Sequence, residues 1–170
     1  MKKLIFPLLV LWGGLLMTGC NKDDGARGKV SFSGVSNDVS SAVINVYERT
    51  ETETNFEIYL MLEGSDIEQL HVGGVYFDLY FEGSLEEFPA GTYTMEDGIL
   101  ETGEYNSNLS GVTEEVEIVS GTLTVGRKGN DYSFEFNGTA SRYDSEAGNY
   151  LAPEPFSCSY SGPVTYTYEF

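Results

Sequence analysis

The sequence predicts an all-β protein whose domain is a single antiparallel β-sandwich or β-barrel of roughly eight to ten strands. Apolar and polar residues alternate with a period of two through several segments, as they do in strands that turn one face to a core. Glycine is frequent, with 20 residues among 170, and no stretch with helical spacing is long enough to predict a helix.

The first half of the domain contains the most regular alternation. Short strands are expected at residues 29–34 and 42–48, followed by long strands at residues 56–63 and 75–82. In both long strands, bulky apolar residues occupy one parity, which predicts a buried face and a wetter face. The tyrosines on the wetter face are Tyr59, Tyr76 and Tyr80.

The second half alternates with interruptions. A strand is expected at residues 91–96, and strands at 116–125 and 132–136 are expected to be joined by a hairpin loop at 126–131. The apolar phase slips inside the second of these three strands, which a β-bulge at Gly121 would explain.

The final strand is the clearest of all. One parity is apolar or aromatic from Phe156 to Phe170, and Cys158 lies on that parity, so its thiol is expected to be buried. The pair Asn137-Gly138 is expected to form a tight turn or a second bulge, and Gly162-Pro163 to break the final strand or place it at an edge.

Two stretches lack periodicity, residues 101–111 and 142–155, and these are expected to be long loops. Long loops on a rigid sheet are frequent binding sites. The candidate ligand-binding residues are the tyrosines in these stretches, Tyr105, Tyr143 and Tyr150. Tyrosine rings can stack on sugars or be buried against a protein. The alternative is that tyrosines pack against another layer and belong to the core.

The N-terminal residues have the form of an export signal. Two lysines precede an apolar run at residues 4–17, which is shorter than the about 20 residues that span a bilayer. We therefore expect a signal peptide at residues 1–19, a flexible tether at residues 20–28 and one all-β domain at residues 29–170.

Residues 16–20, Leu-Met-Thr-Gly-Cys, resemble a bacterial lipobox, in which the cysteine receives acyl chains after the leader is removed. Met17 departs from the Leu, Val or Ile that is usual there. The segment Lys22-Asp23-Asp24 resembles the export signal of surface lipoproteins in the Bacteroidota. The resemblance implies lipidation of Cys20 and an outer-membrane protein facing the cell exterior. Without the export signal, the domain would face the periplasm.

Three later segments also resemble a class of Bacteroidota lipoproteins: residues 88–94, residues 120–125 followed by 132–134, and residues 160–164. In that class, a Pro-x-Gly-Thr-Tyr turn, a Gly-x-Leu-Thr-Val strand and a Tyr-x-Gly-Pro segment recur in this order. The resemblance implies an antiparallel sandwich or a calycin-like barrel, and it assigns no catalytic residue.

The chain is strongly acidic, with 27 acidic against 9 basic residues and a net charge of −18. Such a charge repels nucleic acid, so we expect no nucleic-acid partner. Solubility at a cell surface is the simpler reason for the acidity. Calcium binding is the alternative, but the sequence lacks an Asp-x-Asp-x-Asp-Gly loop, so no metal site and no cofactor are expected.

No catalytic set of residues can be recognised. His71 is the single histidine, which leaves one candidate base and excludes an all-histidine metal site. Neighbouring acids such as Glu86 and Glu87 point to opposite faces of a strand, so a carboxylate pair would have to come from different strands. We therefore expect no enzyme activity.

The expected function is that of a lipid-anchored envelope protein with a non-catalytic binding or structural β-domain, whose partner is a glycan, a small molecule or a protein. One alternative is a small-ligand binder with an open barrel interior, and another is a carbohydrate-processing enzyme. The aromatic alternation before Phe170 also suggests an integral outer-membrane barrel. That alternative would require the apolar parity to face outward, or acids such as Glu57 and Asp78 to face lipid.

Overall fold

The computed structural model describes residues 27–65, 73–107 and 115–168, and the regular structure in these ranges is entirely β-strand. The all-β prediction is therefore confirmed. No helix among these residues is long and apolar enough to cross a membrane. The strands are β1 (Gly28–Phe32), β2 (Val35–Arg49), β3 (Glu53–Leu62), β4 (Gly74–Glu82), β5 (Gly91–Thr94), β6 (Leu100–Asn106), β7 (Glu115–Lys128), β8 (Asp131–Asp144), β9 (Asn149–Tyr150) and β10 (Glu154–Tyr168).

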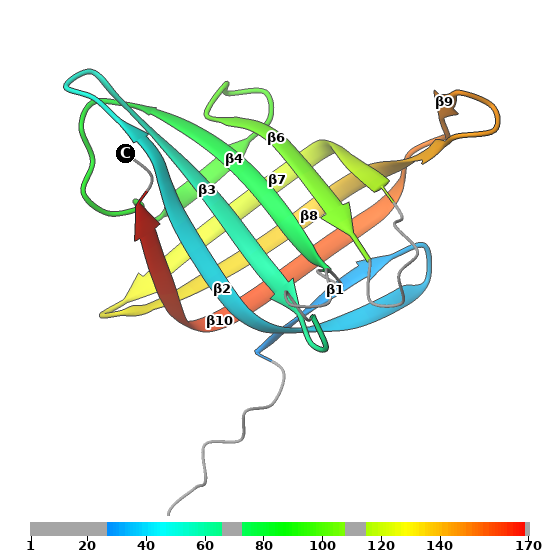
Figure 1. Cartoon of the computed structure of the whole chain (residues 1–170), viewed down its shortest axis with the longest axis horizontal. Coiled ribbons are helices and arrows are strands. Elements are labelled where there is room, and N and C mark those ends of the chain that lie inside the picture. Colours follow the sequence, from blue (N-terminus) through cyan, green and yellow to red (C-terminus); the bar gives the residue numbers. More distant parts are fainter. Residues whose placement is uncertain (1–26, 66–72, 108–114, 169–170) are drawn as a thin grey trace, which may run out of the picture.

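Eight of these strands close into a largely antiparallel barrel (Figure 1). The order around the ring is β7-β6-β4-β3-β2-β1-β10-β8, and pairing of β7 with β8 closes it. The two additional strands, β5 and β9, pair with β7 and β8 respectively. Of the two architectures left open by the sequence, the barrel is therefore the one that forms.

Strand β10 completes the ring by changing its neighbour part-way along. Up to Pro163 it pairs with β8, and its early residues also pair with β1. From Val164 onward it runs parallel to β2, with Val164 opposite Ala42. Gly162-Pro163 therefore neither breaks the strand nor marks an edge of the sheet. These two residues lie where the pairing of β10 with β8 ends and its pairing with β2 begins. Pro163 has no backbone N–H to donate to a neighbouring strand, so it is well suited to this position.

The apolar parity predicted for the long strands faces the inside of the barrel. The ring centroid of Phe77 lies 5.2 Å from that of Phe136, and Phe136 lies 5.9 Å from Phe156, so rings from β4, β8 and β10 meet across the interior. Side chains of Glu57 and Asp78 point outward from β3 and β4. This arrangement is the opposite of the one that a lipid-facing wall requires.

Phe88, which lies between β4 and β5, plugs one end of the barrel. Its side chain is fully buried and packs edge-on against Phe56, with 5.2 Å between ring centroids. Two hydroxyls hold its backbone: the Phe88 N–H donates to Tyr166 Oη at 3.0 Å, and Tyr132 Oη donates to the Phe88 carbonyl at 3.1 Å. Buried backbone groups are thereby satisfied without a strand partner.

The expectation of long loops at residues 101–111 and 142–155 is wrong where strands occupy these residues. Leu100–Asn106 form β6, and the alternation is hidden because Gly103 occupies an inward position. A Cβ atom on Gly103 would lie 3.0 Å from Ile118 Cδ1 and 3.2 Å from Phe77 Cδ1, so side chains of neighbouring strands already fill that space. The second stretch is largely the hairpin formed by the end of β8 and β9.

Strands β7 and β8 also differ in detail from the sequence-based expectation. The bulge lies at Val119 and not at Gly121, because the register passes from Ile118–Ala140 to Ser120–Thr139. The expected loop at 126–131 is reduced to a tight turn at residues 129–130.

Gly138 lies within continuous β8, opposite Gly121, and forms neither a turn nor a bulge. A Cβ atom on Gly138 would overlap the Ser120 carbonyl oxygen and lie 2.7 Å from Gly121 Cα. The two glycines therefore permit a close approach of the two backbones.

Candidate functional site

Several residues named by the sequence analysis lie outside the described part of the chain. These are the lipidation residue Cys20, the export-signal residues Lys22, Asp23 and Asp24, and His71. Their roles stay predictions.

Of the three tyrosines expected in binding loops, Tyr105 is placed in the core. It lies on β6 and is 4% exposed, and its ring centroid is 6.2 Å from that of Phe32. Asn37 Nδ2 donates a hydrogen bond to its hydroxyl at 2.8 Å. The expectation that Tyr105 sits in a loop is therefore wrong.

The other two candidates, Tyr143 and Tyr150, come together on the outside of the barrel. They face each other across β8 and β9, with ring centroids 5.2 Å apart and ring planes at 66°. They are 41% and 47% exposed, and the adjacent Leu151 is also exposed. Figure 1 shows this hairpin projecting beyond the barrel wall. We call residues 143–151 the tyrosine hairpin.

Beside this hairpin, β6 and β7 separate along part of the wall. They pair only where residues 104–106 meet residues 115–117. On the side facing β7, residues 100–103 of β6 have no strand partner among the described residues, and β7 gains its next partner, β5, only from Thr122 onward. The bulge at Val119 lies within this stretch. We call the space between the two separating strands the β6–β7 groove.

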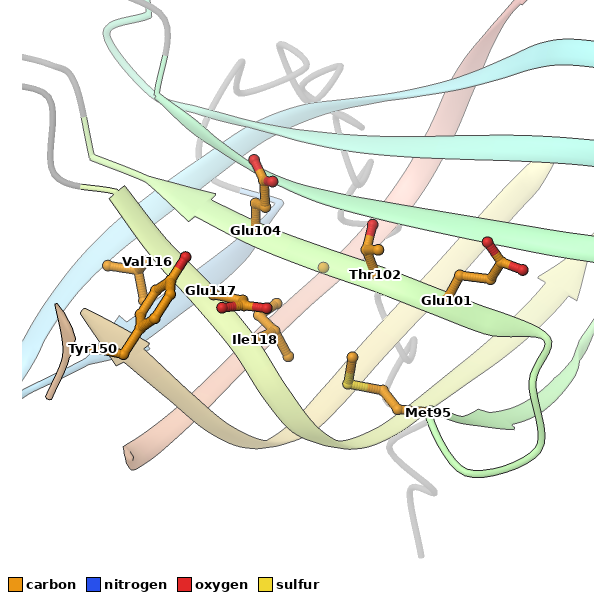
Figure 2. Close-up of a pocket in the computed structure, with 9 residues that line it drawn as sticks. Met95, Glu101, Thr102, Glu104, Val116, Glu117, Ile118 and Tyr150 are labelled. Carbon is orange, nitrogen blue, oxygen red and sulfur yellow. The ribbon is translucent and has the colours of Figure 1, made fainter. Parts of the chain in front are cut away.

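The floor of the β6–β7 groove is apolar. Val116 and Ile118 of β7 line it and are buried, and Ile118 packs toward Gly103 of β6. Figure 2 shows Tyr150 of the tyrosine hairpin at one end and Met95, from the turn after β5, toward the other. The hollow that these residues enclose has a volume of about 150 Å³.

The rim of the β6–β7 groove is acidic. Glu101 and Glu104 on β6 and Glu117 on β7 are exposed, and Glu104 lies opposite Glu117 in the strand register (Figure 2). A second hollow, of about 500 Å³, continues beyond Met95 between residues 94–96 and 119–122. No lysine or arginine lines either hollow. The groove therefore carries negative charge without a basic residue in its lining, which favours a cationic ligand.

A second polar cluster lies on the outer wall of the barrel. Glu57 on β3 accepts hydrogen bonds from Asn45 Nδ2 at 2.9 Å, Tyr59 Oη at 3.0 Å and Tyr76 Oη at 3.1 Å. Thr167 Oγ1 on β10 donates to Asn45 Oδ1 at 2.9 Å. The cluster therefore connects β10, β2, β3 and β4 where the last strand joins the ring, and we call it the wall network.

Two carboxylates meet beside the wall network. Asp78 on β4 lies opposite Glu57 in the register and accepts a hydrogen bond from Asn55 Nδ2 at 2.8 Å. Burial, followed by the charge of Glu57, raises the pKa of Asp78, although the Asn55 hydrogen bond acts in the opposite direction. Burial and the same two carboxylates also raise the pKa of Tyr76, so its hydroxyl stays a donor.

A pair of acids from different strands is what a carbohydrate-processing site would need. However, Glu57 and Asp78 are hydrogen-bonded to side chains of the wall itself, and neither lines the β6–β7 groove. Their arrangement is that of a structural network that ties strands together.

Cys158 lies inside the barrel, as predicted. It is 2% exposed and free of a disulfide, and burial raises the pKa of its thiol. A buried thiol with a raised pKa is a poor nucleophile, so Cys158 is a core residue.

No sequence pattern predicted the β6–β7 groove, because most of its lining comes from strands and only Met95 comes from a turn. One signal was present. The slip in the apolar phase near Gly121 reports the bulge at Val119, and this bulge lies in the stretch where β7 has left β6 and not yet reached β5. A phase slip in a barrel strand can therefore indicate an opening in the wall as well as a local bend.

Within residues 27–65, 73–107 and 115–168, no three His, Cys, Asp or Glu side chains lie together as a metal site would require. Comparison with models of protein families, with curated proteins and with solved structures finds no significant match to this chain.

Proposed function

We propose that the protein is a lipid-anchored outer-membrane protein, acylated at Cys20 and facing the cell exterior, and that its barrel is a non-catalytic binding domain. The signal-like residues 1–19 and the lipobox-like residues before Cys20 support the anchor. The segment Lys22-Asp23-Asp24 supports the exposed location.

The observation that carries the binding role is the contrast between the inside and the outside of the barrel. Inside, the rings of Phe77, Phe136 and Phe156 meet across the interior. Outside, the β6–β7 groove offers an apolar floor and a polar rim next to the exposed rings of Tyr143 and Tyr150. Concave surfaces of this kind bind ligands, and tyrosine gives large contact area with little loss of side-chain freedom. The partner is therefore expected at the outer wall.

A carbohydrate-processing activity is the second candidate, and the meeting of Glu57 and Asp78 favours it. It predicts that the purified protein cleaves a glycan and that Glu57→Gln or Asp78→Asn abolishes the cleavage. The binding proposal predicts no cleavage by any of the three proteins.

The anchor can be tested by mass spectrometry of the protein isolated from its own envelope. The proposal predicts a chain that begins at an acylated Cys20. Whole cells treated with protease should lose the domain, whereas Cys20→Ala should leave the domain unanchored. Protection from protease in intact cells would place the domain in the periplasm, and an unmodified Cys20 would contradict the anchor.

The binding surface can be tested by photo-crosslinking on whole cells. A photoreactive phenylalanine analogue replaces Tyr150 in one variant and the equally exposed Tyr47 of β2 in a control. We expect an adduct from position 150 that depends on Tyr143 and is not formed from position 47. Identical adducts from both positions, or none from position 150, would count against binding at the tyrosine hairpin.

A further inference from the structure

We infer that the wall network holds a calcium ion between β3 and β4, bound by side-chain oxygens of Glu57, Asp78 and Asn55. The site lies on these two strands and not at the tyrosine hairpin, so it is independent of the proposed binding role.

The hydrogen bonds of the wall network end between its two carboxylates. Thr167 donates to Asn45, and Asn45 donates to Glu57. Asp78 lies directly opposite Glu57 in the register of two antiparallel strands, where Cβ atoms are about 4.5–5.5 Å apart. Ionised carboxylates only accept hydrogen bonds, so neither acid can donate to the other. A positive charge is what would join them.

No basic side chain supplies this charge within the described part of the chain. The salt bridges found there are Lys29–Asp38 and Arg127–Glu87. Neither involves Glu57 or Asp78. Burial and the charge of Glu57 raise the pKa of Asp78, so the two negative charges are unfavourable beside each other. A cation bound between them would replace this repulsion by attraction to a shared ion.

The side-chain oxygen of Asn55 is the second observation that points to a cation. Asn55 is 3% exposed, and its Oδ1 atom has no hydrogen-bond partner among the described residues. A buried amide oxygen without a partner is costly. Nδ2 of the same amide donates to Asp78 Oδ1 at 2.8 Å, so the orphan oxygen lies beside the carboxylate pair. A metal ion at the pair would satisfy it.

This set of oxygens suits calcium. Calcium binds carboxylates, amide carbonyls and water with flexible geometry, whereas magnesium demands near-ideal octahedral geometry and loses its water reluctantly. A carboxylate has about four acceptor positions, and Glu57 uses three of them, for Asn45, Tyr59 and Tyr76. With two carboxylates, an amide oxygen in place of a third and water completing the shell, we expect a dissociation constant of about 0.1 to 1 mM, as in extracellular calcium modules.

The thermal test uses the full-length protein in detergent, freed of metal by a chelator and kept at about 0.15 M NaCl to screen general attraction. Calcium chloride at about 10 mM is expected to raise Tm by about 3 to 8 °C, because the ligand is then in at least tenfold excess over the dissociation constant. The same concentration of magnesium should raise Tm by less than about 1 °C.

The matched variants each neutralise one pair of facing acids. The wall variant combines Glu57→Gln with Asp78→Asn. The control combines Glu104→Gln with Glu117→Gln, which also lie opposite each other on paired strands. We expect the calcium shift to be lost in the wall variant and kept in the control. Asn55→Ala should also weaken the calcium shift, although both carboxylates remain.

Terbium locates the ion even if the wall variant does not fold. It replaces calcium at oxygen sites and luminesces when a nearby tyrosine ring is excited. The rings of Tyr59 and Tyr76 are 5.1 Å apart, and both hydroxyls donate to Glu57. We therefore expect emission from the parent protein that calcium displaces and magnesium does not. The double substitution Tyr143→Phe and Tyr150→Phe should leave this emission unchanged.

The inference would be overturned by a calcium shift that persists in the wall variant, or by equal shifts with calcium and magnesium. Emission that requires Tyr143 and Tyr150 would also overturn it, because the ion would then bind at the acids beside the tyrosine hairpin. None of these outcomes affects the adduct expected from position 150 on whole cells, so the proposed binding role is tested separately.

Discussion

At the scale of single residues, Gly138 sets how closely β7 and β8 approach each other. It is not required for a turn, because it lies in the middle of a continuous strand. The space that a side chain would need is already occupied by the backbone of Ser120 and Gly121. Backbone atoms cannot move aside as a flexible side chain can, so a larger residue must push the two strands apart.

Gly138→Ala is accordingly expected to lower the free energy of unfolding by about 2 to 3 kcal/mol. The control is Gly129→Ala in the tight turn, where a Cβ atom meets nothing within 4 Å and only the positive φ of 65° opposes it. That substitution should cost about 1 kcal/mol. Urea unfolding monitored by circular dichroism measures both values, and equal costs would show that the contact between the strands is not tight.

The charge state of Asp78 is coupled to the fold. Burial and Glu57 raise its pKa in the folded protein above the unfolded value, so the folded state holds the proton more tightly. The stabilising contribution is therefore complete below the unfolded pKa and is lost as the pH rises through the folded pKa.

Asp78→Asn imitates the protonated acid and keeps an acceptor oxygen for Asn55. We expect this variant to have a higher Tm than the parent at pH 8, and the difference to shrink as the pH falls through the folded pKa of Asp78. The control is Asp131→Asn on the exposed start of β8. A Tm difference that does not change with pH would contradict the assignment of the effect to Asp78 ionisation.

At the scale of elements, β6 shows what sequence patterns can and cannot predict. Strands β3 and β4 show regular alternation because their inward positions carry bulky side chains that fill the barrel. In β6 the inward position at Gly103 is filled by Ile118 and Phe77 from neighbouring strands, so the strand carries no alternation of its own. Tyr105 was then assigned to a loop although it belongs to the core.

The candidate site also has one part that the sequence indicated and one part that it did not. Tyr143 and Tyr150 were predictable because exposed aromatic residues near turns stand out in the sequence. The β6–β7 groove was not, because it depends on which strands pair over which residues, and such long-range pairing leaves no local pattern. Only the phase slip in β7 pointed to it.

The tyrosine hairpin is expected to be dispensable for folding, because it lies outside the closed ring. Replacing residues 145–148 by the two residues Asn-Gly shortens its turn and should change Tm by no more than about 2 °C, as exposed loop tips tolerate change. When the photoreactive phenylalanine analogue is placed at position 150 of this shortened variant, displacement of that position should abolish the adduct formed on whole cells. A large fall in Tm would show that the hairpin supports the barrel.

At the scale of the whole molecule, closure of the ring depends on contacts between distant parts of the sequence. Val164 to Tyr168 of β10 pair with Ala42 to Val46 of β2, and the wall network reinforces this junction through Thr167 and Asn45. The choice between sandwich and barrel was therefore open at the sequence level, because both architectures have the same alternation within each strand.

The acidity of the whole molecule should make its stability depend on salt. The chain has 27 acidic and 9 basic residues, and the Lys29–Asp38 and Arg127–Glu87 ion pairs are both near the surface. Self-repulsion destabilises a compact, highly charged protein, and salt screens it. Raising NaCl from about 10 mM to about 200 mM is expected to raise Tm by a few degrees. An unchanged or lower Tm would show that local ion pairs outweigh the net repulsion.

The change of neighbour in β10 has a consequence for biosynthesis. The strand that joins β8, β1 and β2 into a ring leaves the ribosome after all of them. A nascent chain that has not yet reached β10 has open sheet edges at β1 and β8 and no closed core. Completion of the barrel is thus delayed until β10 has been translated, so the eight-stranded core forms only after nearly the whole chain has been synthesised.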